Sequence, residues 1–206
     1  LTSADLYPIP SSGLFFVEIT LDTSKLGILA YTTVIGNMNE LSPNNIKQWL
    51  IQTGADGDLR FLYTRNNKII YDDFLTDYPS EVVTIRGEWD DSGVFLYVNG
   101  DLKATTATVI RPNAPTDPIL VASRNGLSSA SFTCYDININ DEHIWKFDEL
   151  EGFVSTSNSG RVFTGSTYHA NGLSYWNNDV RNVTENPYYL RLNNIFVNVH
   201  YLPIHL

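Results

Sequence analysis

The segment Val82–Lys103 constrains the fold more than any other part of this chain. It contains runs of alternating apolar and polar residues separated by two polar turn sequences, Asp90-Asp-Ser-Gly93 and Asn99-Gly100. Asn-Gly tolerates positive φ at both positions, as the type I′ turn of a two-residue β-hairpin requires. The segment therefore predicts a meander of three antiparallel strands.

Strand patterns recur along most of the chain. In Leu14–Leu21, Phe15 and Ile19 fall on one face and Glu18 falls on the other. Turn residues follow at intervals of roughly ten residues, which is typical of a sandwich or barrel, and no convincing amphipathic helix appears. The other strands we expect are 28–35, 46–53, 59–63, 68–71, 81–86, 93–98, 102–106, 119–123, 131–139, 143–147, 161–164 and a C-terminal run from Ile195.

One of these segments has an alternative interpretation. Ser42-Pro43 resembles a helix start, so 46–53 could be helical. We favour a strand, because the segment leads into the turn sequence Gly54-Ala-Asp-Gly57 and then into the strand pattern Leu59–Tyr63.

Phe95-Leu-Tyr-Val-Asn-Gly100 closely resembles the central hairpin of laminin-G-like and concanavalin A-like domains. The flanking strand patterns follow in the same order, so the resemblance covers residues 14–147. It implies an all-β fold, an antiparallel two-sheet jelly-roll sandwich with C-terminal added strands. We expect one such domain over 1–187 and a C-terminal strand segment, a candidate interface arm, over 188–206.

A second resemblance concerns the kind of protein in which this domain occurs. Tyr135–Gly152 and the later Gly172-Leu-Ser-Tyr-Trp176 are similar in style to the ends of such domains in bacteriophage virion proteins. The single cysteine, Cys134, excludes an intramolecular disulfide, which secreted animal domains often carry. We therefore expect a tail-fibre, tailspike or capsid-surface protein, located on a virion or at an extracellular surface.

Charge and hydropathy exclude two classes of partner. The formal net charge is -10, and the 13 basic residues are scattered, so a nucleic-acid partner is not expected. No apolar run of about 18 residues occurs, so membrane insertion is not expected either.

The arrangement of carboxylate residues in the sequence indicates whether a glycosidase site is present. Glycoside hydrolases need two carboxylates flanking the scissile bond, and the glucanases that share the resembled fold place them as Glu-x-Asp-x-x-Glu. Glu88-Trp-Asp90 supplies the first two positions, but Gly93 occupies the third. We interpret Glu88 and Asp90 as parts of a solvated acidic turn, so the sequence predicts a non-enzyme.

Two candidate binding sites remain. Aromatic faces can stack on sugar rings while amides and carboxylates bind the hydroxyls, and a polar loop offers that mixture at Tyr168, Tyr175, Trp176, Asn177 and Asp179. Calcium is a candidate cofactor, because the resembled laminin-G-like domains often bind one ion with Asp side chains and carbonyls. Its candidate ligands are the turn residues Asp56, Asp58, Asp90 and Asp91, although ordinary turn chemistry also favours Asp there.

The sequence thus predicts a recognition module that binds carbohydrate, or a surface protein, without catalysis. The alternative from another class is a structural virion protein, for capsid decoration or tail assembly, that acts through subunit contacts and forms homo-oligomers. Apolar residues on both faces of 195–202 favour some intersubunit burial. A glycoside hydrolase is the third and weakest alternative.

Overall fold

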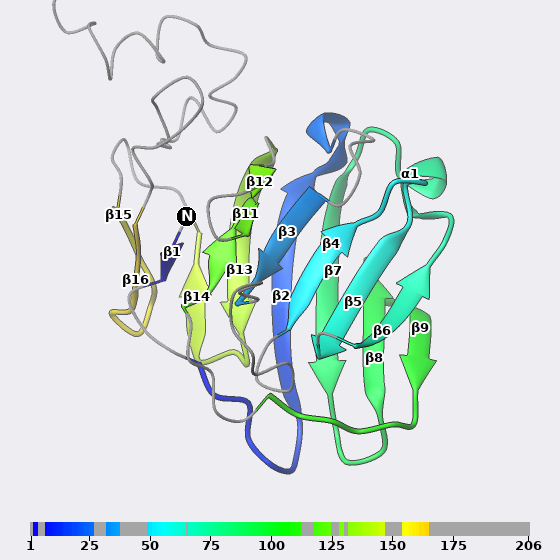
Figure 1. Ribbon diagram of the computed structural model, residues 1–206. Helices are drawn as coiled ribbons and strands as arrows, with labels where there is room; N and C mark the ends of the chain where they lie inside the picture. Colours follow the sequence, from blue (N-terminus) through cyan, green and yellow to red (C-terminus); the bar gives the residue numbers. More distant parts are fainter. Residues whose placement is uncertain are drawn as a thin grey trace, which may run out of the picture.

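The computed structural model describes 2–3, 7–26, 32–37, 49–64, 66–112, 118–124, 128–129, 132–146 and 154–164. These residues form strands and two single helical turns (Figure 1). The elements are β1 (Thr2–Ser3), β2 (Phe15–Asp22), η1 (Thr23–Lys25), β3 (Thr32–Gly36), β4 (Leu50–Thr53), β5 (Leu59–Thr64), β6 (Asn67–Tyr71), α1 (Phe74–Asp77), β7 (Val82–Trp89), β8 (Val94–Val98), β9 (Asp101–Thr106), β10 (Leu120–Val121), β11 (Ser123–Arg124), β12 (Ser128–Ser129), β13 (Thr133–Ile139), β14 (His143–Trp145), β15 (Val154–Thr156) and β16 (Val162–Thr164).

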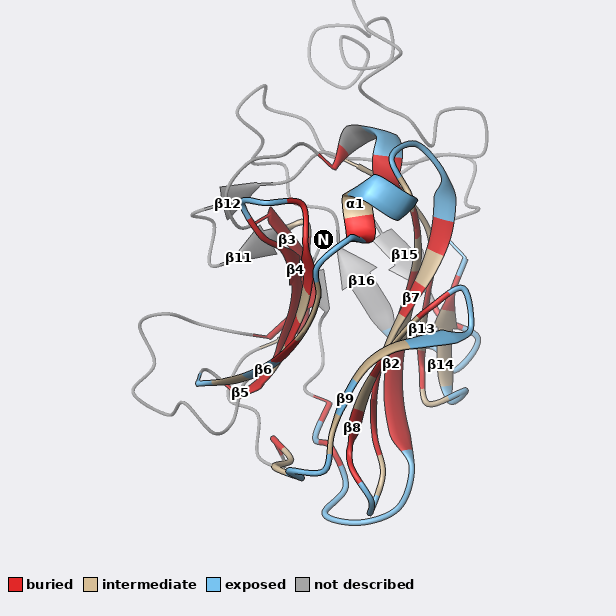
Figure 2. Ribbon diagram, turned by 90° about the vertical axis from the view of Figure 1, so that its right-hand side faces the viewer, coloured by how far each residue is buried: buried red, intermediate tan, exposed pale blue. Residues whose placement is uncertain are grey.

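Two antiparallel sheets face each other as layers of a sandwich (Figure 2). In the described residues, sheet A has the order β15-β16-β1-β10-β3-β4-β5-β6 and sheet B has the order β14-β13-β2-β7-β8-β9. Strands β11 and β12 form a separate two-stranded sheet next to β3. The fold is therefore an all-β, antiparallel jelly roll, and the predicted fold class is confirmed.

The predicted meander is present. Strands β7, β8 and β9 pair in order, with Arg86 opposite Tyr97 and Val98 opposite Asp101. Asn99 and Gly100 have φ values of 52° and 84°, so the tight turn forms where the sequence places it. Within 46–53, the described part is strand β4, which confirms the preference over helix for Leu50–Thr53.

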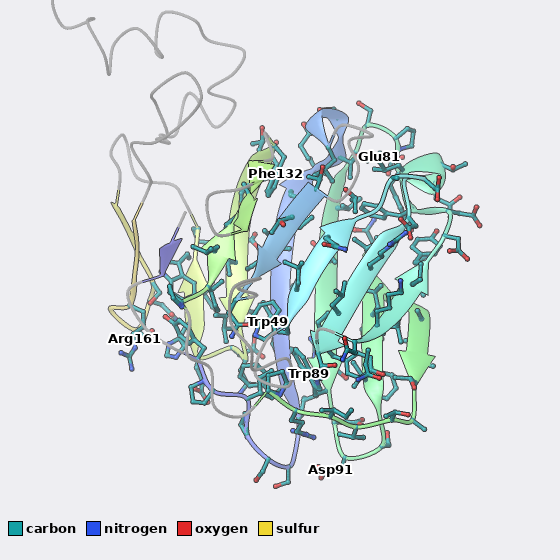
Figure 3. The ribbon with its side chains drawn as sticks, in the orientation of Figure 1. Trp49, Glu81, Trp89, Asp91, Phe132 and Arg161 are labelled. Carbon is teal, nitrogen blue, oxygen red and sulfur yellow. The ribbon has the colours of Figure 1, made fainter. Side chains whose placement is uncertain are left out.

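The core lies between the sheets and is rich in aromatic rings. Trp89 of sheet B packs against Phe61 of sheet A and against Trp49, which directly precedes β4, at ring-centroid distances of 4.8 and 6.2 Å. Figure 3 labels Trp49 and Trp89. Gly87 makes this approach possible, because a Cβ there would lie 2.7 Å from the Phe61 ring. The inward faces of both sheets thus hold the apolar residues, as the alternation predicts.

Both long sides of the sandwich are closed by specific contacts. At one side, Lys103 of β9 lies over the rings of Tyr71 and Tyr78, which joins sheet B to the β6–α1 region. At the other side, Asn158 pairs with the backbone of Ile144 in β14 through its own N–H and its side-chain oxygen. These contacts occupy backbone groups at the β14 edge that would otherwise be open to another strand.

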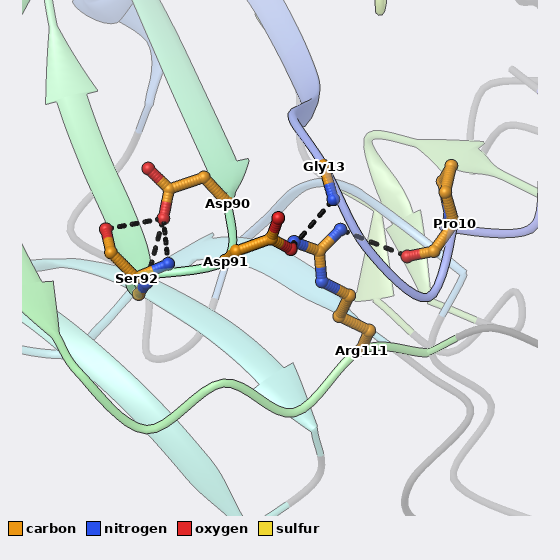
Figure 4. A network of polar contacts seen from close by, with 7 residues as sticks. Pro10, Gly13, Asp90, Asp91, Ser92 and Arg111 are labelled. Carbon is orange, nitrogen blue, oxygen red and sulfur yellow. Dashed lines mark hydrogen bonds and ion pairs between the residues drawn. The ribbon is translucent and has the colours of Figure 1, made fainter.

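A polar network fastens one end of the sandwich (Figure 4). Arg111 donates to the carbonyl of Pro10 at 3.0 Å and to Asp91 Oδ1 at 3.1 Å, and Gly13 N–H donates to the same carboxylate oxygen at 2.8 Å. The Arg111 side chain is only 5% exposed. The network therefore holds the β7–β8 turn, the loop before β2 and the segment after β9 together.

The predicted division at residue 187 and the strand segment 188–206 lie outside the described residues. Among the described residues, no helix has the length and apolar character needed to cross a bilayer.

Candidate functional site: a hollow on the outer face of sheet B

The outer face of sheet B contains a hollow of about 310 Å³. It is formed across three neighbouring strands and the turn that follows them, and its size lies at the lower end of the roughly 300–1,000 Å³ typical of small-molecule sites. Its side chains alternate with the inward-facing core residues of the same strands. The lining residues are Glu18 from β2, Thr84, Arg86 and Glu88 from β7, Tyr97 from β8, and Gly100.

Strand register brings these side chains together. Glu18 of β2 lies directly opposite Arg86 of β7, and Arg86 lies directly opposite Tyr97 of β8. Along the next row, Thr20 and Thr84 share a hydrogen bond of 3.0 Å between their hydroxyl oxygens. A carboxylate, a guanidinium and a phenol therefore form a continuous row across the sheet.

Arg86 is held in a fixed position. Its guanidinium carbon lies 3.6 Å from the centre of the Phe16 ring, a cation–π contact. Its Nε donates to Glu88 Oε2 at 2.8 Å, and its terminal nitrogen forms an ion pair with the same oxygen at 2.5 Å. The Glu88 residue is only 9% exposed. The guanidinium charge is thus already neutralised from within the site.

Glu88 corrects one sequence interpretation. We expected Glu88 and Asp90 to form a solvated acidic turn, but Glu88 lies in strand β7 and is buried against Arg86. Asp90 does lie in the turn, where its Oδ1 accepts hydrogen bonds from Ser92 and Gly93. The two members of the partial glucanase pattern therefore have unrelated surroundings.

Glu18 is the unpaired group of the hollow. Its side chain forms no hydrogen bond or ion pair with any described residue, although the residue is partly buried. Burial raises the pKa of its carboxyl, Arg86 opposes this rise, and Asp136 and Asp141 reinforce it. A partly desolvated carboxylate without a partner costs stability, and such costs concentrate at functional sites.

Replacing Glu18 with Gln is expected to stabilise the protein at neutral pH. Because the folded-state pKa is raised above the unfolded value of about 4.3, wild-type stability falls as pH rises between these two values and stays lower above them. The advantage of Glu18→Gln should therefore be full at pH 7 and vanish below about pH 4. Urea unfolding across this pH range measures it, and a variant that is less stable at pH 7 would contradict the assignment.

Aromatic rings extend the hollow along β8. Phe95 and Tyr97 are stacked, with ring centroids 6.3 Å apart and an interplanar angle of 30°. Both side chains point away from the core and are partly exposed. Burial raises the pKa of Tyr97, and the negative charge of Glu88 and a side-chain hydrogen bond with it add to the rise. The site therefore combines an aromatic platform with hydrogen-bonding groups.

The predicted sugar site is a different set of residues from those that line this hollow. Tyr168, Tyr175, Trp176, Asn177 and Asp179 all lie outside the described residues and stay a prediction. Alternation along Leu14–Leu21 predicts that Glu18 lies on the polar face of its strand, but nothing in the local sequence distinguishes it as a site residue. The alternation of apolar and polar residues in β2, β7 and β8 shows which side chains face outward. It does not show the register between these strands, which decides which of those side chains meet.

The four predicted calcium ligands fall into two separate pairs. Asp56 and Asp58 lie in the β4–β5 turn beside α1, whereas Asp90 and Asp91 lie in the β7–β8 turn at the opposite end of the sandwich (Figures 1 and 3). Asp58 forms an ion pair with Arg60 at 2.5 Å, and its other oxygen is buried without a partner. In the described ranges, no group of three or more His, Cys, Asp or Glu residues could hold a metal ion. Calcium thus stays a prediction.

Cys134 has the properties of a structural thiol. Burial raises its pKa well above the ordinary value, and the negative charge of Asp136 adds to the effect. Because the thiolate is the reactive form, this thiol is suppressed as a nucleophile at neutral pH.

Comparison with known proteins supports the fold but assigns no family. No family model matches the chain, and no curated protein sequence matches it. Domains LG4-5 of the mouse laminin α1 chain share a TM-score of 0.50 at 11% identity, over 68% of this chain and 38% of that one. The Ruminococcus gnavus IT-sialidase CBM40 gives 0.46 at 14% identity, over 62% and 75%. A Bacillus licheniformis β-glucanase gives 0.37 at 18% identity, over 66% of each chain. The laminin likeness shows the jelly-roll fold alone.

Proposed function

We propose that this protein is a carbohydrate-recognition module and that its ligand binds in the hollow on the outer face of sheet B. One observation carries the proposal: the stacked rings of Phe95 and Tyr97 lie beside the fixed Arg86–Glu88 pair and the unpaired Glu18. Aromatic faces pack against the C–H groups of a sugar ring, while convergent polar groups orient its hydroxyls. The size of the hollow suits one sugar residue, with the rest of a glycan continuing over the sheet.

Each group has a distinct role in this proposal. Tyr97 supplies the stacking surface and a hydroxyl oxygen that can accept from the sugar, and Arg86 donates through the N–H groups that Glu88 leaves available. Glu18 accepts from sugar hydroxyls, which gives its carboxylate the partners it lacks within the protein. Because Phe16 and Glu88 hold Arg86 in place before binding, little side-chain entropy is lost there when a ligand binds.

Replacing Tyr97 with Ala is expected to weaken glycan binding by about tenfold or more, since it removes both the stacking surface and the phenol. Tyr97→Phe keeps the ring and should retain most of the affinity. Binding would be measured on a glycan array and by calorimetry with the strongest array ligand, after circular dichroism has confirmed the fold of each variant.

Trp176→Ala is the matched comparison, because it removes the largest aromatic residue of the site predicted from sequence. If Trp176→Ala abolishes binding and Tyr97→Ala does not, the sugar site lies in the 168–179 segment and the outer face of sheet B is not used.

We further propose that the protein binds glycans without cleaving them. Two features support this: Gly93 stands where the glucanase pattern requires a carboxylate, and Arg86 occupies the Glu88 carboxylate that could otherwise act as a base. Incubation with the bound polysaccharide should therefore release no reducing sugar. Release that Glu88→Gln abolishes would establish a hydrolase instead.

The location on a virion or other extracellular surface stays a proposal, as does the alternative of a structural virion protein. Apolar residues on both faces of 195–202 favour assembly through this segment. Deleting 188–206 should then convert an oligomer into a monomer in analytical ultracentrifugation. A full-length chain that is already monomeric would count against the assembly role and leave the glycan proposal intact.

A further inference from the structure

The surroundings of the hollow are acidic. Among the described residues, the carboxylates that line the hollow or act on Glu18 outnumber the basic groups that do so, and the whole chain carries a net charge of -10. The acidic groups are Glu18, Glu88, Asp136 and Asp141, and the basic groups are Arg86 and Lys146.

Both basic groups already have carboxylate partners. Arg86 is bound to Glu88 at 2.5 Å, and Lys146 lies 3.9 Å from Asp136. Lys146 is also well exposed, so solvent and salt screen its charge. Among the residues that the structure describes, Glu18 is therefore the carboxylate lining the hollow that has no ion pair of its own.

An acidic glycan would meet an unfavourable field in this site. Its carboxylate or sulfate would approach Glu18, and the Arg86 charge that could compensate is already neutralised by Glu88, although some of its N–H groups stay available to a ligand. Like charges in contact disfavour binding more strongly where burial reduces solvent screening. A ligand with hydroxyl or ammonium donors instead satisfies the Glu18 carboxylate, and charge-assisted hydrogen bonds of this kind are strong.

We propose that the hollow selects glycans without acidic groups, either neutral sugars or amino sugars that donate to Glu18, and that it rejects carboxylated and sulfated glycans. This inference rests on the proposed function, because it names the chemical class of ligand for the same site. Glu18 is the residue that determines this specificity.

The test uses the full chain on an array of matched glycans, each present in neutral, amino and acidic forms, such as lactose beside its sialylated derivative. Neutral and amino forms should bind at least about tenfold more strongly than their acidic counterparts at low salt. The difference in affinity between the neutral and acidic forms should become smaller at high salt, because salt screens the repulsion between Glu18 and the acidic group of the glycan. Binding of the neutral forms should change little with salt.

Glu18→Gln removes one negative charge with almost no change of shape. It should raise binding of the acidic forms by about tenfold, towards that of their neutral partners. Asp72→Asn is the matched control, because it changes the net charge equally at an exposed position between β6 and α1, away from the hollow. This control should leave the selectivity unchanged.

The outcomes separate the two proposals. Binding that favours acidic glycans, or selectivity that Glu18→Gln leaves unchanged, would overturn the charge selectivity while the carbohydrate-binding function stands. If no glycan of any class binds the folded chain, the proposed function itself fails, and the selectivity fails with it.

Discussion

Trp89→Ala is expected to lower the free energy of unfolding by about 3–5 kcal/mol, the range for removing a large buried aromatic side chain. Trp89 is fully buried and contacts Phe15, Trp49 and Phe61, so its loss leaves a cavity between the two sheets. For a chain of this size, the melting temperature should fall by roughly 6–20 °C. Calorimetry and urea unfolding would measure the change.

Trp89→Phe provides the control. The indole N–H of Trp89 is buried without a hydrogen-bond partner among the described residues, so a phenyl ring removes an unsatisfied donor while keeping much of the volume. We expect Trp89→Phe to lower the free energy of unfolding by about 1–2 kcal/mol. Equal losses for the two variants would contradict the packing described between the sheets.

Gly87→Ala is expected to cost about 1–3 kcal/mol through overpacking. The new Cβ would lie 2.7 Å from Cζ and 2.9 Å from Cε1 and Cε2 of Phe61, and this ring is fully buried against Trp89. The sheets would have to separate directly beneath the hollow. Urea unfolding measures the stability, and glycan titration of the same variant reports whether the hollow is distorted.

A second substitution, at Phe61, tests whether contact with this ring causes the instability of Gly87→Ala. Phe61→Leu should make Gly87→Ala less costly, so the double variant should lose less stability than the two single variants added together. Gly13→Ala is the comparison: its φ is +79° and nothing lies within 4 Å of a Cβ there, so its cost of about 1 kcal/mol should come from backbone strain and be independent of Phe61. Strict additivity of Gly87→Ala and Phe61→Leu would show that the two residues do not meet.

The local features of the fold could be predicted from sequence because short-range chemistry determines them. The Asn99-Gly100 turn follows from the positive φ that both residues tolerate, and the reversal after Asp90 follows from its side-chain bonds to Ser92 and Gly93. The inward face of β2 follows from alternation alone. α1 was not predicted, since four residues are too few to show a helical period.

The candidate site could not be predicted in the same way. It exists because β2 pairs with β7, which places Glu18 opposite Arg86 although the two residues lie far apart in the sequence. Nothing local fixes this register; it depends on the packing of the whole inner face. From the local pattern, Glu88 is interpreted as part of a turn, whereas the neighbouring strands place it in a buried ion pair with Arg86.

The most direct test of the central claim is an NMR titration of the labelled chain with its strongest glycan ligand. If the sugar binds where we place it, the largest amide shift changes will occur at Glu18, Arg86 and Tyr97 and along the strands that carry them. Changes confined to the segment 168–179, with β2, β7 and β8 unmoved, would show that the outer face of sheet B is not the binding surface.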